Sequence, residues 1–167
     1  TLTQQLAKNL FPREKKSAFG TVYAKLKEWI VAVKLERNYS KDEILSMYLN
    51  TVDYGNNAFG IKAASHTFFT KLPSELEVEE AAVLVGLLKA PTTYNPVRNP
   101  ENALKRRNTV LSQMEKYGYL TSEELETKSA LPIQLKYNPQ AHDEGIATYF
   151  REMLRNYMKD WCKTHYK

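Results

Sequence analysis

The chain has 167 residues, of which 43% are hydrophobic and 26% charged, and this composition excludes a disordered protein and fits one domain with a buried core. A single Cys excludes a framework of internal disulfides, and no apolar run reaches the 18 residues that a membrane-spanning helix needs. The net charge of +5 is uneven, because residues 1–41 hold nine Lys or Arg and three acids. A basic end favours an anionic partner such as a membrane surface, a phosphorylated ligand or nucleic acid, although a solvated basic face is the plain alternative.

Apolar residues recur at helical spacing along most of the chain, which predicts a mainly α fold. Two capping boxes support helix starts, Ser40 with Glu43 and Thr121 with Glu124, and a third is expected at residues 74–77. The predicted helices cover residues 2–11, 21–37, 41–50, 61–70, 74–90 and 103–117, with a short one after residue 121 and an amphipathic one over 146–161. Residues 133–137 form the one predicted strand, and residues 13–20 and 51–60 are predicted loops.

The helix predicted over 21–37 places two kinds of residue on neighbouring arcs. At about 100° per residue, Lys25 and Glu28 share an arc with Ala32, Leu35 and Glu36. The adjoining arc is an apolar stripe, expected to pack, of Val22, Leu26, Trp29, Ile30 and Val33. A Lys and a Glu above a small Ala could line a cleft, where burial would strengthen the charge contact. The same spacing also fits an ordinary surface ion pair.

The first predicted helix also has a polar face. Gln5, Lys8 and Asn9 share it, next to Gln4, while the leucines occupy another face. Amide groups suit a sugar, and a Lys ammonium is a compact charge that suits phosphate. The alternative is an ordinary polar helix surface.

Several other classes of site find little support. His66, His142 and His165 are far apart and lack the spacing of metal ligands, which argues against a zinc site. Eleven Tyr beside a basic segment would suit single-stranded nucleic acid. However, Tyr48, Tyr149 and Tyr157 occupy core-like helical positions, so no nucleic-acid partner is expected.

Four segments in order resemble motifs of the peptidoglycan glycosyltransferases of class A penicillin-binding proteins. Residues 1–9, Thr-Leu-Thr-Gln-Gln-Leu-Ala-Lys-Asn, look like the end of the second motif, and Lys25-x-x-Glu28-x-x-x-Ala32-x-x-Leu35-Glu36 matches the third. Residues 41–64 resemble the fourth motif and residues 80–96 the fifth. The resemblance implies a lysozyme-like helical glycosyltransferase domain over residues 1–137. Residues 138–167 look similar to the connector toward a transpeptidase domain of a bifunctional enzyme.

This resemblance implies an enzyme that polymerises lipid II and releases undecaprenyl pyrophosphate. A carboxylate takes the proton of the acceptor hydroxyl, and positive groups or a divalent cation (Mg²⁺ or Mn²⁺) stabilise the departing diphosphate. No tightly bound cofactor and no metal site built from protein ligands alone is implied. The implied partners are lipid II, the growing glycan strand, the membrane surface and cell-wall synthesis proteins. The implied location is the periplasmic face of the inner membrane.

The family's functional residues carry over to matching positions only. Glu28 would be the second essential carboxylate, with its role open between orienting substrate, organising Lys25 and helping to bind metal. Lys25 would belong to the set that stabilises phosphate. The expected substrate-binding residues are Thr3, Gln4, Gln5, Lys8, Asn9, Lys25 and Arg13. Arg13 stands early for the family's loop Arg, and Lys15 and Lys16 compete for that role.

One departure concerns the first motif, whose Glu is the family's general base and which matches nothing in the chain. We therefore expect an N-terminally truncated domain that alone polymerises no lipid II. No Ser has a Lys three residues later, so acylation by β-lactams is not expected. The rival interpretations are a non-catalytic lobe that binds a lipid-linked saccharide or a cell-wall partner, and a lysozyme-like hydrolase. Lys8 and Lys25 suit phosphate departure better than hydrolysis.

Overall fold

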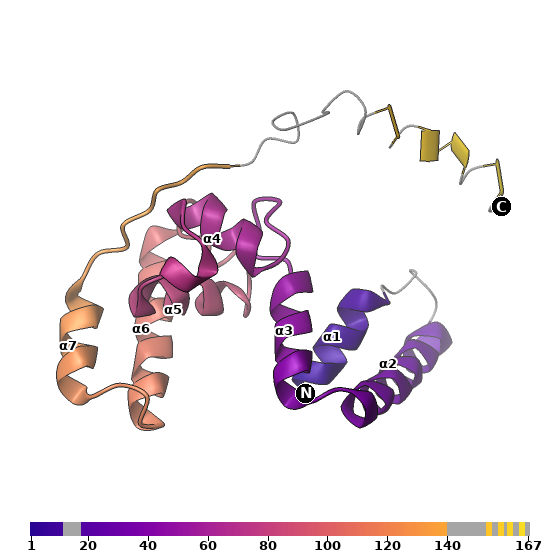
Figure 1. The fold of residues 1–167 in the computed structure, drawn as a ribbon, viewed down its shortest axis with the longest axis horizontal. Coiled ribbons are helices and arrows are strands. Elements are labelled where there is room, and N and C mark those ends of the chain that lie inside the picture. The colour runs from indigo at the N-terminus through magenta and orange to yellow at the C-terminus, as the bar shows by residue number, and fades with distance from the viewer. Residues whose placement is uncertain (12–17, 140–152, 155–156, 159, 162–163, 166–167) are drawn as a thin grey trace.

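The computed structural model describes residues 1–11, 18–139, 153–154, 157–158, 160–161 and 164–165. Over these residues the fold is helical, which confirms the predicted class (Figure 1). The helices are α1 (Leu2–Leu10), α2 (Ala18–Asn38), α3 (Lys41–Thr51), α4 (Ile61–Phe69), α5 (Val78–Leu87), α6 (Pro100–Lys116) and α7 (Ser122–Ala130), with a 3₁₀ turn, η1 (Pro73–Glu75). No helix among the described residues is long and apolar enough to cross a bilayer.

Two predicted capping boxes are confirmed and the third is wrong. Ser40 and Glu43 cap α3 reciprocally, and Thr121 and Glu124 cap α7 in the same way. The box expected over residues 74–77 is replaced by η1, and α5 begins at Val78 with Glu77 as its N-cap. Pro73 explains the shift, because proline fits the first position of a helical turn and starts η1 ahead of the predicted box.

The strand predicted over residues 133–137 is also wrong, since the described residues contain an isolated bridge between Asp53 and Phe59 but no strand. Residues 131–139, which we call the strap, run extended across the end of α4. The backbone N–H of Lys136 donates to the carbonyl of Phe68 at 3.0 Å, and that of Asn138 donates to Thr67 at 2.8 Å. The last carbonyls of a helix lack partners within it, so the strap satisfies groups that α4 leaves open.

The helix predicted over 146–161 lies mostly outside the described residues, although the parts described at 153–154, 157–158, 160–161 and 164–165 are helical. Of the three tyrosines expected in the core, Tyr48 is buried, as predicted, and Tyr149 lies outside the described residues. The prediction was wrong for Tyr157, which is 65% exposed. The proposed boundary at residue 137 stays a prediction.

The described helices form two groups that lie side by side (Figure 1). In the first, α1 packs against α2 and α3, and its small buried cluster consists of Leu6, Ile44 and Tyr48. In the second, α5 packs against α6 and α6 against α7. The larger cluster there consists of Tyr54, Ala58, Ala64, Phe68, Phe69, Val83, Leu84 and Leu87.

Helix α2 packs with the arc that sequence periodicity had assigned to the cleft. Glu28 and Ala32 are buried, and Ala7 of α1 is buried as well. Because Ala7 and Ala32 have small side chains, α1 and α2 can approach closely. The apolar stripe is not packed as expected, because its side chains are between 46% and 62% exposed. We call this stripe the α2 ridge: Val22, Leu26, Trp29, Ile30 and Val33.

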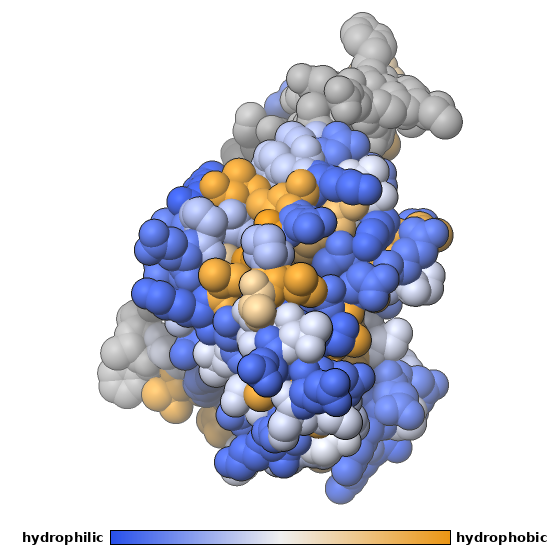
Figure 2. Space-filling view, turned by 90° about the vertical axis from the view of Figure 1, so that its left-hand side faces the viewer, coloured by the Kyte–Doolittle hydropathy of each residue, from blue (hydrophilic) through white to orange (hydrophobic). Residues whose placement is uncertain are grey.

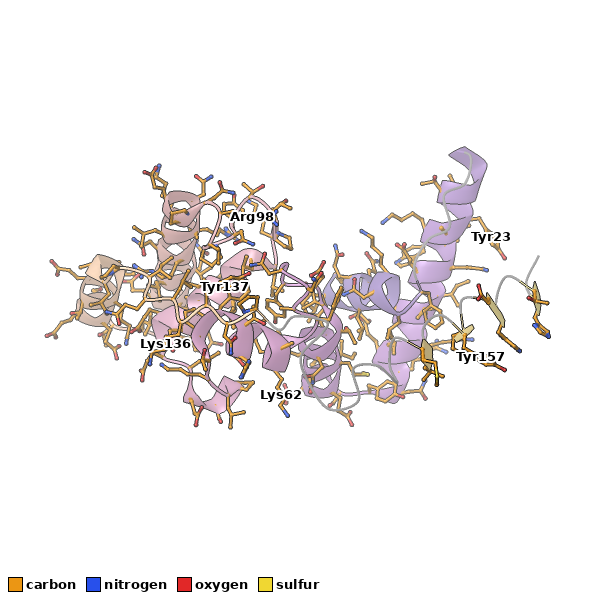
Figure 3. The ribbon with its side chains drawn as sticks, turned by 90° about the horizontal axis from the view of Figure 1, so that it is seen from above. Tyr23, Lys62, Arg98, Lys136, Tyr137 and Tyr157 are labelled. Atoms are coloured by element: carbon orange, nitrogen blue, oxygen red, sulfur yellow. The ribbon has the colours of Figure 1, made fainter. Side chains whose placement is uncertain are left out.

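The position of α2 explains the exposure of the ridge. Figure 3 shows Tyr23 on a part of α2 that projects away from the other helices, so α1 covers one side of α2 only. By contrast, the face of the molecule on the α7 side is mostly hydrophilic, with its apolar surface gathered in the middle (Figure 2).

Candidate functional site

The site is built where α1 lies against α2. Thr1 caps α1, and its hydroxyl accepts a hydrogen bond from the backbone N–H of Gln4 at 3.3 Å. Leu6 and Ala7 are buried, which seats α1 in the first helix group. Burial of this apolar face fixes the position of α1 along α2, and with it the position of Gln4.

A side-chain hydrogen bond fixes the two helices in register. The hydroxyl of Thr3 donates to Oε1 of Glu36 at 2.7 Å, and Thr3 is 6% exposed. Because the acceptor is a carboxylate, this bond is stronger than one between neutral groups. Thr3 thus has a structural partner, and its contact with substrate stays a prediction. Sequence reasoning gave Glu36 no role, because nothing near it in the sequence indicates that α1 packs on its arc of α2.

Lys25 and Glu28 form an ion pair in which the two side chains are very differently exposed. Nζ of Lys25 lies 3.3 Å from Oε2 of Glu28, and the exposed fractions of the side chains are 64% and 7%. A buried carboxylate is costly unless it is paired, so the position of Glu28 favours a cation next to it. The carboxylate of Glu28 is thus on the buried side of the pair, and the ammonium of Lys25 reaches toward solvent. That is more than an ordinary surface pair, in which both groups are solvated.

These groups line one hollow of about 280 Å³ between α1 and α2. Gln4 enters it from α1, and Lys25 and Glu28 from α2. The remaining lining side chains come from the ridge, namely Val22, Leu26 and Trp29. The hollow therefore combines an amide, an ammonium and a buried carboxylate with an apolar rim. Sequence reasoning took these ridge residues for core and missed them as lining.

The other predicted residues are not brought into the hollow. Gln5, Lys8 and Asn9 are exposed on α1, and none of them lines it. Arg13 lies outside the described residues. Within the described part of the chain, no cluster of three or more His, Cys, Asp or Glu could hold a metal ion. The polar contacts of the hollow therefore come from Gln4, Lys25 and Glu28.

Comparison with known proteins gives a consistent result. The transglycosylase family model matches residues 1–115. Over 158 residues the chain is 40% identical to penicillin-binding protein 1A of Aquifex aeolicus, covering 95% of the chain and 21% of that protein. It is 42% identical over 155 residues to penicillin-binding protein 1F of Bacillus subtilis, covering 93% of the chain and 21% of that protein.

A solved structure agrees with these relatives. The crystal structure of penicillin-binding protein 1A from Haemophilus influenzae matches 98% of the chain and 20% of its own length, at 29% identity and a TM-score of 0.54. The chain thus spans about a fifth of the length of the curated relatives it matches. The ordered motifs, the helical fold and these matches together show that the chain belongs to the transglycosylase family, whose relatives here are class A penicillin-binding proteins.

Proposed function

We propose that the hollow between α1 and α2 receives the diphosphate end of a lipid-linked sugar donor. The chain would thereby supply the donor side of a glycosyl transfer that polymerises lipid II into glycan strands and releases undecaprenyl pyrophosphate. The observation that supports this proposal is the meeting of Gln4, Lys25 and Glu28, from two separate sequence motifs, in one hollow. An amide can hydrogen-bond sugar hydroxyl or acetamido groups, and an ammonium attracts phosphate oxygens.

The proposed reaction forms one bond and breaks another at the anomeric carbon of the donor. The acceptor hydroxyl oxygen forms the new glycosidic bond, the bond to the diphosphate oxygen breaks with its electron pair, and the hydroxyl proton passes to a carboxylate base. Negative charge grows on the diphosphate, where Lys25 would stabilise it. Glu28 would act as a positioning residue that holds the Lys25 ammonium 3.3 Å from its own oxygen. Of the three roles left open for Glu28, the ion pair favours this one.

Two parts of the proposal lie beyond the hollow. The family's general base belongs to its first motif, which none of the 167 residues matches, so the chain alone is proposed to bind donor without polymerising it. A divalent cation at the diphosphate fits only if phosphate oxygens supply most of its ligands. In that case Glu28 is the carboxylate that could contribute, because Mg²⁺ favours one or two carboxylates with substrate phosphates.

The α2 ridge supports a proposed bilayer contact. Its five apolar side chains are exposed on a helix within the stretch 1–41, which carries nine basic and three acidic residues. An apolar face beside basic residues suits the interface of an anionic membrane. We place this contact at the periplasmic face of the inner membrane, where the lipid-linked donor, the growing glycan strand and cell-wall synthesis proteins would meet the chain.

The test compares the 167-residue chain with one extended at its N-terminus by the family's first motif. Glycan synthesis from lipid II in detergent is followed by gel electrophoresis, and donor binding by a fluorescent lipid II analogue. We expect binding by both chains and polymer from the extended chain only. In the extended chain, Lys25→Ala should lower the rate by roughly a hundredfold or more, as loss of a charge stabiliser does. Glu28→Gln should lower it similarly while leaving the helical circular dichroism unchanged.

Lys34→Ala is the matched control, because Lys34 is exposed on the same helix and lies about 180° from Lys25 around the axis. It should keep the parent rate. A Glu28→Gln variant with nearly normal turnover would contradict the role of Glu28. Polymer made by the 167-residue chain would contradict the need for the first motif. Binding by the extended chain without any polymer would favour the non-catalytic lobe.

A further inference from the structure

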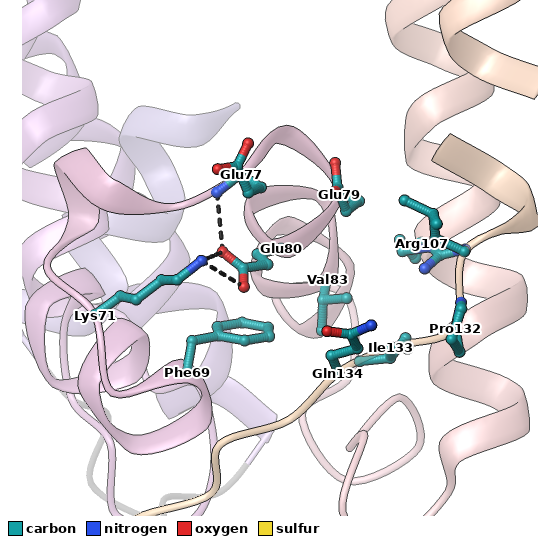
Figure 4. Close-up of a pocket in the computed structure, with 11 residues that line it drawn as sticks. Phe69, Lys71, Glu77, Glu79, Glu80, Val83, Arg107, Pro132, Ile133 and Gln134 are labelled. Carbon is teal, nitrogen blue, oxygen red and sulfur yellow. Dashed lines mark hydrogen bonds and ion pairs between the residues drawn. The ribbon is translucent and has the colours of Figure 1, made fainter. Parts of the chain in front are cut away.

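A second cavity, of about 180 Å³, lies in the other helix group and shares no lining residue with the hollow at α1 and α2. It is bounded by the end of α4, by α5 and α6, and by the first residues of the strap (Figure 4). Phe69, Val83 and Ile133 supply apolar surface. The proposed glycosyl transfer gives this cavity no role.

Most of the charge around this cavity is already neutralised. Nζ of Lys71 lies 2.7 Å from Oε2 of Glu80 on one wall (Figure 4). Nζ of Lys128 lies 3.1 Å from Oε2 of Glu79. Each of these carboxylates thus has its own ammonium. Glu77, the third carboxylate of the lining, is exposed, so solvent screens it.

Arg107 is the exception, because it lines the cavity and is only 1% exposed. Its Nε and Nη2 donate to Oδ1 of Asn108 at 3.0 and 2.9 Å, and Nη2 also donates to the carbonyl of Ser129 at 3.0 Å. Both acceptors are neutral. Glu79 acts on Arg107 through space, while its own Oε2 is taken by Lys128. Burial accordingly lowers the pKa of Arg107.

The remaining nitrogen, Nη1 of Arg107, is buried and has no hydrogen-bond partner among the described residues. The bond to Ser129 gives the side chain a structural purpose, since it joins α6 to the last turn of α7, where a cation also meets the negative end of a helix dipole. That purpose accounts for Nη2 but leaves the two hydrogens of Nη1 unused. Buried donors in native proteins are almost always satisfied, so an acceptor is missing here.

We propose that this cavity binds a small carboxylate with a short apolar body, whose oxygen accepts from Nη1 of Arg107. The apolar body would lie against Phe69, Val83 and Ile133. A cavity of about 180 Å³ is slightly larger than the roughly 150 Å³ cavity that holds benzene, so a ligand of about six to eight heavy atoms fits. A single negative charge matches one unpaired guanidinium. A doubly charged phosphate would bring one more negative charge into the cavity than the guanidinium of Arg107 can neutralise.

The test uses the purified 167-residue chain, ¹⁵N-labelled, and titrates it with isovalerate, with the neutral isostere isovaleramide and with inorganic phosphate. We expect isovalerate to shift the backbone amides of Val83, Leu131, Ile133 and Gln134 with a saturable dependence. Isovaleramide and phosphate should bind at least tenfold more weakly. Arg107→Gln should abolish the isovalerate shifts, and Lys105→Gln, which removes an exposed charge from the same helix, should not.

Gln134→Trp covers the case in which Arg107→Gln fails to fold. The bulkier side chain fills the cavity from the strap while Arg107 stays in place, so it should also abolish the shifts. Shifts that do not saturate, an equal affinity for isovaleramide, or isovalerate binding that survives Gln134→Trp would overturn the proposal. Tighter binding of phosphate would overturn the choice of a carboxylate. None of these measurements depends on glycan synthesis, so the proposed function is tested separately.

Discussion

The two helix groups differ in how much apolar surface they bury. In the group α4 to α7, eight apolar residues form one buried cluster, whereas the cluster of α1 to α3 has three. The first group instead joins α1 to α2 by a polar contact, Thr3 to Glu36, and leaves the α2 ridge exposed. The region with the candidate donor site thus buries little and exposes much, which is typical of segments that bind or move.

The largest expected effect is in the larger cluster. Phe68 is fully buried there, and Phe68→Ala should lower the free energy of unfolding by about 3–5 kcal/mol, because it removes the ring and leaves a cavity. Urea unfolding followed by circular dichroism measures this. Phe59→Ala is the matched control, since Phe59 is 64% exposed, and should cost below about 1 kcal/mol. Equal losses in the two variants would contradict the assignment of the core.

The next effect concerns the ridge and rests on the proposed bilayer contact. Ile30 and Val33 belong to the ridge but do not line the hollow, so changing them spares the donor site. Each Ser substitution should weaken binding to anionic vesicles by roughly tenfold, because burial of such a side chain contributes about 1.5–3 kcal/mol when complete. Flotation with vesicles measures the change. Val97→Ser removes an exposed apolar side chain from the other group, and binding lost equally there would contradict a specific contact.

A smaller effect should follow from breaking the polar contact between α1 and α2. Thr3→Val keeps the shape of the side chain but leaves Glu36 without its hydroxyl donor. We expect a loss of about 1 kcal/mol, seen as faster amide hydrogen exchange in α1. Thr3→Ser restores the hydroxyl and should recover most of the protection. Unchanged exchange in Thr3→Val would mean that apolar packing alone holds α1.

Much of this fold could be predicted because its signals are local. The capping boxes at Ser40 and Thr121 were found because each depends on residues three positions apart. The strand at 133–137 was predicted wrongly, since the partner of the strap is the end of α4, about 68 residues earlier, and an extended backbone on a helix end has the same local pattern as a strand.

For the candidate site, helical periodicity correctly grouped Lys25 and Glu28 on one arc of α2 and the ridge on another. It could not tell which arc a neighbouring helix covers, because that depends on α1. The apolar side chains of the ridge predicted that a neighbouring helix would cover it, yet α1 packs on the arc of Glu28. The pairing of Thr3 with Glu36 joins residues 33 positions apart and has no local signal.

The smallest expected effect tests whether the hydroxyl of Tyr54, which is buried in the larger cluster, has a hydrogen-bond partner. Tyr54 is completely buried in it, and its hydroxyl has no hydrogen-bond partner among the described residues. An unsatisfied buried hydroxyl lowers stability, so Tyr54→Phe should be neutral or should raise the free energy of unfolding by up to about 1 kcal/mol at pH 7. Tyr119→Phe is the control, because Tyr119 is 77% exposed. A loss above about 1 kcal/mol in Tyr54→Phe would show that the hydroxyl has a partner.

Alkaline pH tests the burial of Tyr54 in a second way. Burial, and secondarily the charge of Tyr48, raises the pKa of Tyr54 well above its ordinary value near 10. The folded state therefore keeps the phenolic proton at a pH where the unfolded state loses it. The part of the free energy of unfolding that comes from this pKa difference is fully present below about pH 10 and is lost as the pH rises toward the folded pKa. Urea unfolding at pH 9 and pH 11 should show a smaller loss in Tyr54→Phe than in the parent, whereas an equal loss would mean that the phenol ionises without unfolding the core.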